Sequence, residues 1–60
     1  LFAQEAKSPE AGQAYNEGNN LYSKQQYEQA IAKYNEAVQA DENFPEAHYM
    51  MALTHKKLKQ

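Results

Sequence analysis

Cysteine, arginine and tryptophan are all missing from this chain. Without cysteine it forms no disulfide and offers no thiolate ligand to a metal. Six lysines stand against eight acidic residues, for a net charge of −2. A mildly acidic chain without arginine is a poor nucleic-acid binder, because it neutralises few phosphates and cannot read guanine edges bidentately. No apolar run approaches the roughly 20 residues needed to span a bilayer, so we expect no membrane insertion.

The size of the chain limits its core. Sixty residues make at most one small domain, and 42% of them are hydrophobic, with alanine and tyrosine supplying much of that share. A chain of this length buries only about 60% of its unfolded surface, so its core is marginal. Tight helix packing or a partner must therefore supply the stability that disulfides cannot.

The first residues, LFAQEAK, allow two interpretations. Two large apolar residues followed by Ala-Gln resemble the end of a signal peptide, where an apolar region meets a small residue before cleavage. A remnant of this kind would favour the bacterial periplasm or cell envelope. Alternatively, residues 1–8 are a linker tail, which leaves the cytoplasm as the other location.

Two matching stripes predict a helical hairpin. Ser8, Pro9 and Glu10 suit the cap, first turn and positive pole of a helix. Small or apolar residues then recur at helical spacing: Ala11, Ala14, Tyr15, Gly18, Leu21 and Tyr22, and again Tyr27, Ala30, Ile31, Tyr34, Ala37 and Val38. The stripes predict helices over 9–24 and 27–40, and so short a link makes them antiparallel.

A third helix is predicted over 45–58. It opens at Pro45-Glu46 after the turn residues Asp41-Glu42-Asn43, and its basic end complements the negative pole of a helix dipole. Its apolar set is Ala47, Met50, Met51, Leu53 and Leu58. No strand pattern competes, so the fold class is all-α.

The stretch NEGNN, residues 16–20, sits inside the first predicted helix although glycine and asparagine are poor helix formers. Gly18 falls on the apolar stripe, six residues before the link, and Ala30 lies four residues after it. We therefore expect Gly18 and Ala30 to form the point where the two helices approach most closely.

The spaced residues of 18–38 resemble a tetratricopeptide (TPR) repeat, a 34-residue helix–turn–helix unit. The matching positions are Gly18, Leu21, Tyr22, Tyr27, Ala30, Ile31, Tyr34, Ala37 and Val38. The resemblance implies a right-handed α-solenoid fragment of about one and a half repeats. Residues 9–44 would form one unit, and residues 45–60, which open with PEAHYMMA, the first helix of a following repeat or a capping helix.

The chain departs from the family pattern in places. The large apolar residue expected before the glycine is Glu17, the glycine expected in the turn is Gln25, and the proline expected after the second helix is Glu42. These departures concern how well the helices pack.

Signatures of catalysis are absent from the sequence. It has no cysteine nucleophile, no glycine-rich phosphate loop and no HExxH motif. His48 and His55 are two helical turns apart, about 10.5 Å along the axis, which is too far for one shared metal. We therefore expect no enzyme activity, no metal and no cofactor.

The resemblance implies a groove that takes a peptide, lined by the first helices of successive repeats. Its residues here would be Tyr15, Asn19, Tyr22, Tyr49, Leu53 and Lys56. Asparagine can bond to a peptide backbone, and tyrosine offers an apolar face with a polar tip. Tyr15 suits packing inside the hairpin equally well.

We therefore expect a protein–protein interaction module that binds a partner peptide or scaffolds a complex. The alternative is a structural unit that self-associates through exposed helix faces. Some TPR domains clamp acidic C-terminal tails with Lys, Asn and Arg. Here Asn19 matches that set, but Tyr15 stands in the lysine position and arginine is absent, so a clamp of this kind is poorly supported.

Overall fold

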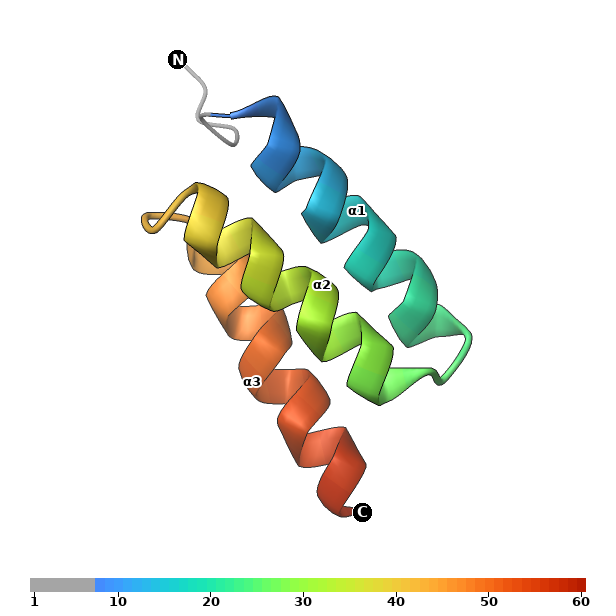
Figure 1. Cartoon of the computed structure of the whole chain (residues 1–60). Coiled ribbons are helices and arrows are strands. Elements are labelled where there is room, and N and C mark those ends of the chain that lie inside the picture. Colours follow the sequence, from blue (N-terminus) through green and yellow to red (C-terminus); the bar gives the residue numbers. More distant parts are fainter. Residues whose placement is uncertain (1–7) are drawn as a thin grey trace.

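The computed structural model describes residues 8–60, which form three helices. Helix α1 spans Pro9–Ser23, α2 spans Tyr27–Ala40 and α3 spans Pro45–Lys59. In Figure 1, α1 and α2 form an antiparallel hairpin, and α3 packs on α2 while running in the direction of α1. The all-α prediction is confirmed, with helix ends shifted by a single residue in α1 and α3. The interpretation of the first residues as a signal-peptide remnant lies outside the described residues.

The predicted start of α1 is formed as expected. The Oγ of Ser8 accepts a hydrogen bond from the Ala11 N–H at 3.0 Å, Pro9 occupies the first turn, and Glu10 lies at the positive pole. In the link before α3, the Asn43 N–H donates to the Asp41 carboxylate at 3.2 Å, which is a local turn bond. The Ser8 side chain therefore caps the start of α1, whereas α3 begins at Pro45 without a side-chain cap.

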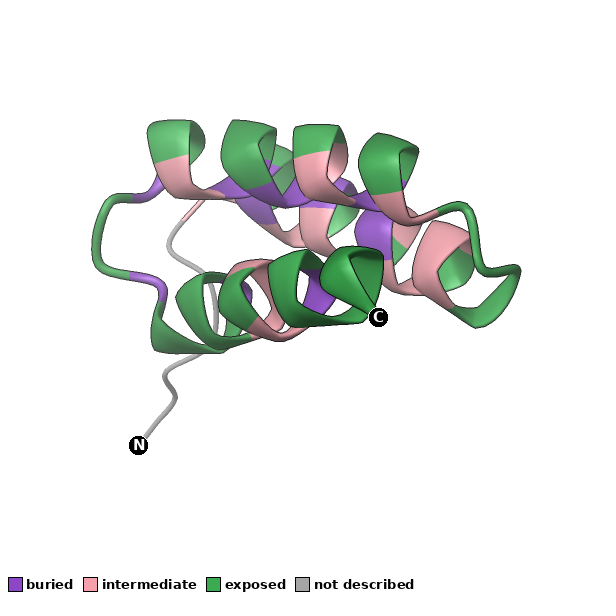
Figure 2. Ribbon diagram, turned by 90° about the horizontal axis from the view of Figure 1, so that it is seen from below, coloured by how far each residue is buried: buried purple, intermediate pink, exposed green. Residues whose placement is uncertain are grey.

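Small side chains fill most of the core. The main cluster consists of Ala11, Ala14, Ala37, Phe44 and Ala47. Alanine lets helix backbones approach closely, but each alanine buries little apolar area. Figure 2 shows the buried residues along the facing sides of the helices, with the outer faces exposed.

Helix α3 buries a different set from the one its apolar residues suggested. Ala47 is buried, but Leu58 is 42% exposed. Thr54 is fully buried, and its hydroxyl donates to the carbonyl oxygen of Met50 at 2.6 Å. A threonine that satisfies its hydroxyl within its own helix can sit in a core, and a search for apolar residues misses it.

Gly18 marks a close approach, but its expected partner was wrong. A Cβ built on Gly18 would lie 2.6 Å from Cε1 and 2.7 Å from Cδ1 of Tyr34, and its nearest neighbours do not include Ala30. Ala30 was predicted by counting residues from the turn, which compares only backbone positions. A large helical side chain leans toward the N-terminus of its helix, so the Tyr34 ring covers the surface one turn before its own Cα.

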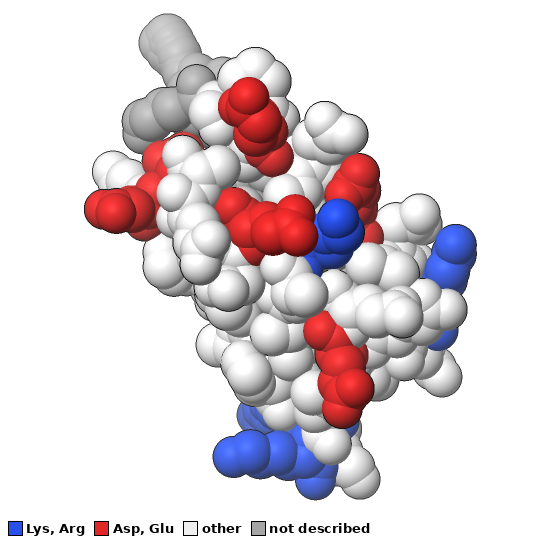
Figure 3. Space-filling view, viewed as in Figure 1, with Lys and Arg blue, Asp and Glu red and all other residues white. Residues whose placement is uncertain are grey.

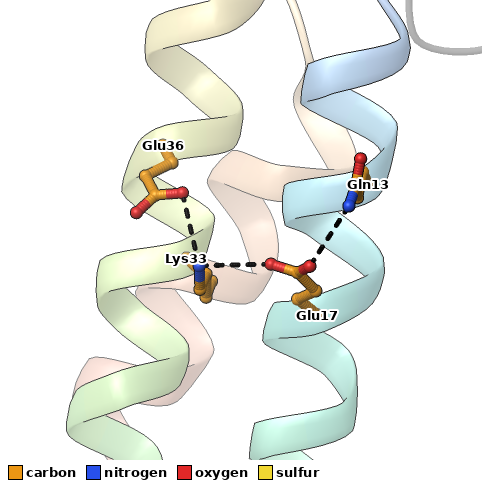
Figure 4. A network of polar contacts seen from close by, with 4 residues as sticks. All are labelled: Gln13, Glu17, Lys33 and Glu36. Atoms are coloured by element: carbon orange, nitrogen blue, oxygen red, sulfur yellow. Dashed lines mark hydrogen bonds and ion pairs between the residues drawn. The ribbon is translucent and has the colours of Figure 1, made fainter.

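The structure explains why Glu17 stands before this glycine in place of the expected large apolar residue. Glu17 accepts from the Lys33 ammonium at 3.2 Å, which links α1 to α2 across the surface (Figure 4). Gln13 donates to the same carboxylate at 3.4 Å, and Lys33 also reaches Glu36 at 3.6 Å. The hydrogen bond and charge of Glu17 raise the pKa of Lys33 above its ordinary value.

The turn after α1 closes in the geometry that usually requires glycine. The Gln26 N–H donates to the Leu21 carbonyl and the Gln25 N–H to the Tyr22 carbonyl, both at 2.9 Å. This pair of bonds places Gln25 in the left-handed region, at φ 64°. A side chain there costs roughly 1–2 kcal/mol, so the turn carries strain at Gln25.

We expect Gly18→Ala to lower the free energy of unfolding by about 1–3 kcal/mol, because the buried Tyr34 ring cannot move away from the new methyl group. Alanine is the better helix former, so an open site would show the opposite sign. Urea denaturation measures the difference. The control Asn20→Ala lies on the exposed side of the same helix and should change stability by less than about 0.5 kcal/mol. A Gly18→Ala protein as stable as the original would contradict the contact.

We expect Gln25→Gly to raise the free energy of unfolding by about 0.5–1 kcal/mol, since relief of the left-handed strain exceeds the added flexibility of glycine. Gln26→Gly is the matched control, because Gln26 has a φ of −92° that any residue adopts. It should be neutral or destabilising in the same thermal unfolding assay. Equal effects of the two substitutions would show that the turn is unstrained.

Candidate functional site

The face between α1 and α3 contains a hollow beside the start of α3. The rings of Tyr15 and Phe44 pack with centroids 5.1 Å apart, which brings the two helices together at this point. Next to this contact is an open hollow of about 370 Å³, lined by Tyr15, Pro45, Glu46, Tyr49 and Met50. The volume falls at the lower end of the roughly 300–1,000 Å³ range of ligand pockets, which suits a side chain of a larger partner.

The three predicted groove residues of α1 are half-buried and have internal partners. Tyr15 packs against Tyr34 as well as Phe44, with centroids 6.0 Å and 5.1 Å away. The ring of Tyr22 meets Tyr27 edge-on at 5.3 Å. These side chains therefore help to hold the fold in addition to any role at the surface.

Asn19 also has an internal partner. Its Oδ1 accepts a hydrogen bond from the Tyr34 hydroxyl at 2.6 Å. Its amide NH₂ group is the part of the side chain that can donate to another molecule. Asn19 therefore holds the hydroxyl of the ring that lies on Gly18.

The predicted groove residues of α3 are more accessible. Tyr49 is 65% exposed, Leu53 is half-buried and Lys56 is exposed. Leu53 and Lys56 follow Tyr49 by one and two helical turns, so all three share one face of α3. This surface is continuous with the hollow, because Tyr49 belongs to both.

The sequence prediction missed three residues on this surface. Pro45, Glu46 and Met50 line the hollow with Tyr15 and Tyr49. The signal was present, because Glu46 precedes Tyr49 by three residues and therefore lies on the same side of the helix. The prediction considered only residues four and seven positions after Tyr49, and so it did not include Glu46.

Tyr34 combines the burial and bonding that organise this region. It is fully buried, and burial raises the pKa of its hydroxyl to about 12, with Tyr15 and Tyr22 adding smaller effects. The neutral hydroxyl is the form that donates to Asn19. The hydrogen bond therefore persists through the neutral pH range.

Other polar groups lie outside this face. A second hollow of about 750 Å³ follows another side of α1, lined by Pro9, Gly12, Gln13, Asn16, Glu17 and Asn20. The His48 ring is 3.1 Å from the carbonyl oxygen of Glu42, so it contacts the link before α3. Residues 8–60 contain no group of three potential metal ligands and no helix with the length and hydropathy of a membrane span.

Comparison with known families identifies the fold. The family model of the TPR repeat matches residues 18–59, which include the end of α1 and all of α2 and α3. The chain belongs to the tetratricopeptide repeat family and contains about one and a half repeats. Such repeats form a non-catalytic, helical protein-interaction fold, so the chain is in general terms a protein–protein interaction module. Neither the curated proteins nor the solved structures that were compared gave a match.

The raised pKa of Tyr34 makes stability depend on alkaline pH. In the unfolded chain a tyrosine titrates near 10, whereas Tyr34 in the folded chain titrates at about 12. The unfolded state therefore loses its proton first, and stability falls as the pH rises from 10 to 12, by up to roughly 3 kcal/mol. Tyr34→Phe should remove this part of the alkaline loss, at a cost of about 1 kcal/mol at pH 7 for the missing hydrogen bond.

Unfolding by urea at a series of pH values measures both effects. The exposed Tyr49 provides the matched control Tyr49→Phe, which should retain the alkaline loss. If Tyr34→Phe and Tyr49→Phe show the same dependence on pH, Tyr34 is not the group responsible.

Proposed function

We propose that the face between α1 and α3 binds a peptide segment of a partner protein, and that the chain acts by binding and not by catalysis. The supporting observation is Tyr49, a large aromatic side chain that is 65% exposed beside an apolar hollow. Tyrosine in such a place offers a large contact area and a polar tip, and aromatic anchors of this kind dominate many interfaces.

The two helices would contribute differently to binding. On α1, Tyr15, Asn19 and Tyr22 form a wall held in place by the hairpin, with the Asn19 amide as a donor to the partner backbone. On α3, Tyr49, Leu53 and Lys56 present accessible side chains. A rigid wall facing an accessible helix reduces the ordering cost of binding, because half of the surface is already fixed.

We also infer that residues 9–44 act as one repeat unit and that α3 is the first helix of a following repeat or a cap. The link between the end of α2 at Ala40 and the start of α3 at Pro45 supports this division, and the family match continues through α3. His48, Ala52 and His55 are exposed along one side of α3, and Leu58 is 42% exposed in a hollow beside the start of α2. Association of copies through these exposed parts of α3 is the alternative function, favoured by the exposed leucine.

Selection from a random peptide display library tests the groove. We expect selected peptides to shift the NMR signals of Tyr22, Tyr49 and Leu53, and we expect Tyr49→Ala to weaken their binding at least tenfold, because anchors of this kind carry a large share of the binding energy. Asn35→Ala is the control, since Asn35 is exposed on α2; it should leave binding unchanged. Equal binding by both variants would exclude the groove as the site.

Sedimentation of the chain over a range of concentrations distinguishes peptide binding in the groove from self-association. A mass that stays monomeric while peptides bind supports the groove, whereas growth of the mass with concentration, reduced by Leu58→Lys, supports self-association.

A further inference from the structure

We propose that the peptide held in this groove carries an apolar side chain and, two to four residues away from it, a carboxylate. This inference depends on the proposed function, because it assigns a chemistry to the ligand of the same groove. It follows from the order in which apolar and charged side chains occur along the exposed face of α3.

One end of the groove is apolar. The hollow between α1 and α3 is bounded mainly by Tyr15, Pro45, Tyr49 and Met50. These side chains offer contact area and few hydrogen-bonding groups, so an aliphatic or aromatic side chain of the ligand fills the hollow at the lowest desolvation cost. The apolar residue of the ligand therefore belongs at this end.

The other end of the groove is basic. Leu53 is followed by Lys56 and Lys57, three and four residues further on, so both lysines continue the face that Tyr49 and Leu53 begin. Both are exposed in the last turns of α3. Figure 3 shows lysine side chains gathered where α3 ends, while acidic side chains lie over the middle and the opposite end of this face, with one of them just above the lysine group. A carboxylate of the ligand is attracted to this end.

The remaining charge in the groove fixes the order of the two ligand groups. Glu46 lines the hollow, so a ligand carboxylate next to the apolar side chain would meet a like charge. The proposed groove residues of α1 are Tyr15, Asn19 and Tyr22, which include no acidic or basic side chain. The carboxylate must therefore be displaced from the hollow toward Lys56 and Lys57.

Helix geometry sets the separation. From Tyr49 to Lys56 is seven residues, or about 10.5 Å along the helix axis. An extended peptide covers about 3.3 Å per residue, so about three residues span this distance. The flexible lysine side chains widen the range to two to four residues.

Titrations of the chain with synthetic peptides, followed by NMR, test this inference. The probes are capped eight-residue serine–glycine peptides that carry leucine with glutamate three residues away, leucine with lysine at the same place, or serine in place of leucine with the glutamate kept. We expect the leucine–glutamate probe to shift groove signals at the lowest concentration, about fivefold below the leucine–lysine probe, which is the size of effect that two exposed ion pairs supply. The serine probe should not bind measurably.

Charge reversal on α3 provides the decisive variant. Lys56→Glu combined with Lys57→Glu should reverse the order, so that the leucine–lysine probe binds more tightly than the leucine–glutamate probe. If the substitutions only destabilised the helix, they would weaken the binding of both probes and would not reverse the order of their affinities. Lys24→Glu combined with Lys59→Glu changes the net charge equally, at positions off the Tyr49–Leu53 face, and should preserve the original order.

The outcomes separate this inference from the proposed function. Groove shifts that are equal for glutamate and lysine probes, with no effect of charge reversal, overturn the carboxylate while leaving the groove in place. The same holds if library-selected peptides bind the groove but none of the leucine probes does. If neither library peptides nor probes perturb the groove, both proposals are wrong. If groove signals shift only with protein concentration, both proposals are also wrong and a second copy occupies this face.

Discussion

The contact between the Tyr34 ring and the backbone of Gly18 sets how closely α1 and α2 approach. The same ring donates its hydroxyl to Asn19 and packs against Tyr15. Tyr15 in turn contacts Phe44, the residue immediately before α3. One buried tyrosine thus fixes the hairpin spacing and, through two aromatic contacts, the place where the third helix starts. Among residues 8–60, whose core is built largely of alanine, no other fully buried side chain is as large.

The helix propensity lost in the NEGNN stretch is offset by this contact. Glycine costs about 1 kcal/mol in a helix interior, but here any side chain would overlap the ring. Asn19 supplies the acceptor for a hydroxyl whose burial without a partner would cost about 1–3 kcal/mol. Two weak helix formers are therefore the residues that allow a tyrosine to be buried between two helices. Asn20 is exposed, and nothing in the structure explains it.

The sequence predicted features that depend on the spacing of residues along a helix, but it did not predict contacts that depend on how far a side chain extends. The stripes and the Ser8 cap predicted the three helices, since spacing and capping are local properties. The partner of Gly18 was wrong because the Tyr34 ring extends a full turn beyond its backbone. Thr54 was overlooked because its hydroxyl is satisfied within α3. The exposure of Tyr49 depends on how α3 is placed against the other two helices, and the pattern of one helix does not contain that information.

The small core also connects stability with the proposed binding. Alanine-rich packing buries little apolar area, and the chain leaves Tyr49 and Leu58 largely exposed on α3. A ligand that covers Tyr49 and Met50 would add apolar burial that the chain cannot provide for itself. Because such a ligand binds the folded state and not the unfolded chain, it would stabilise the fold in proportion to its saturation. The attachment of α3 would gain most, since α3 packs mainly on α2 and contacts α1 chiefly through Tyr15 and Phe44.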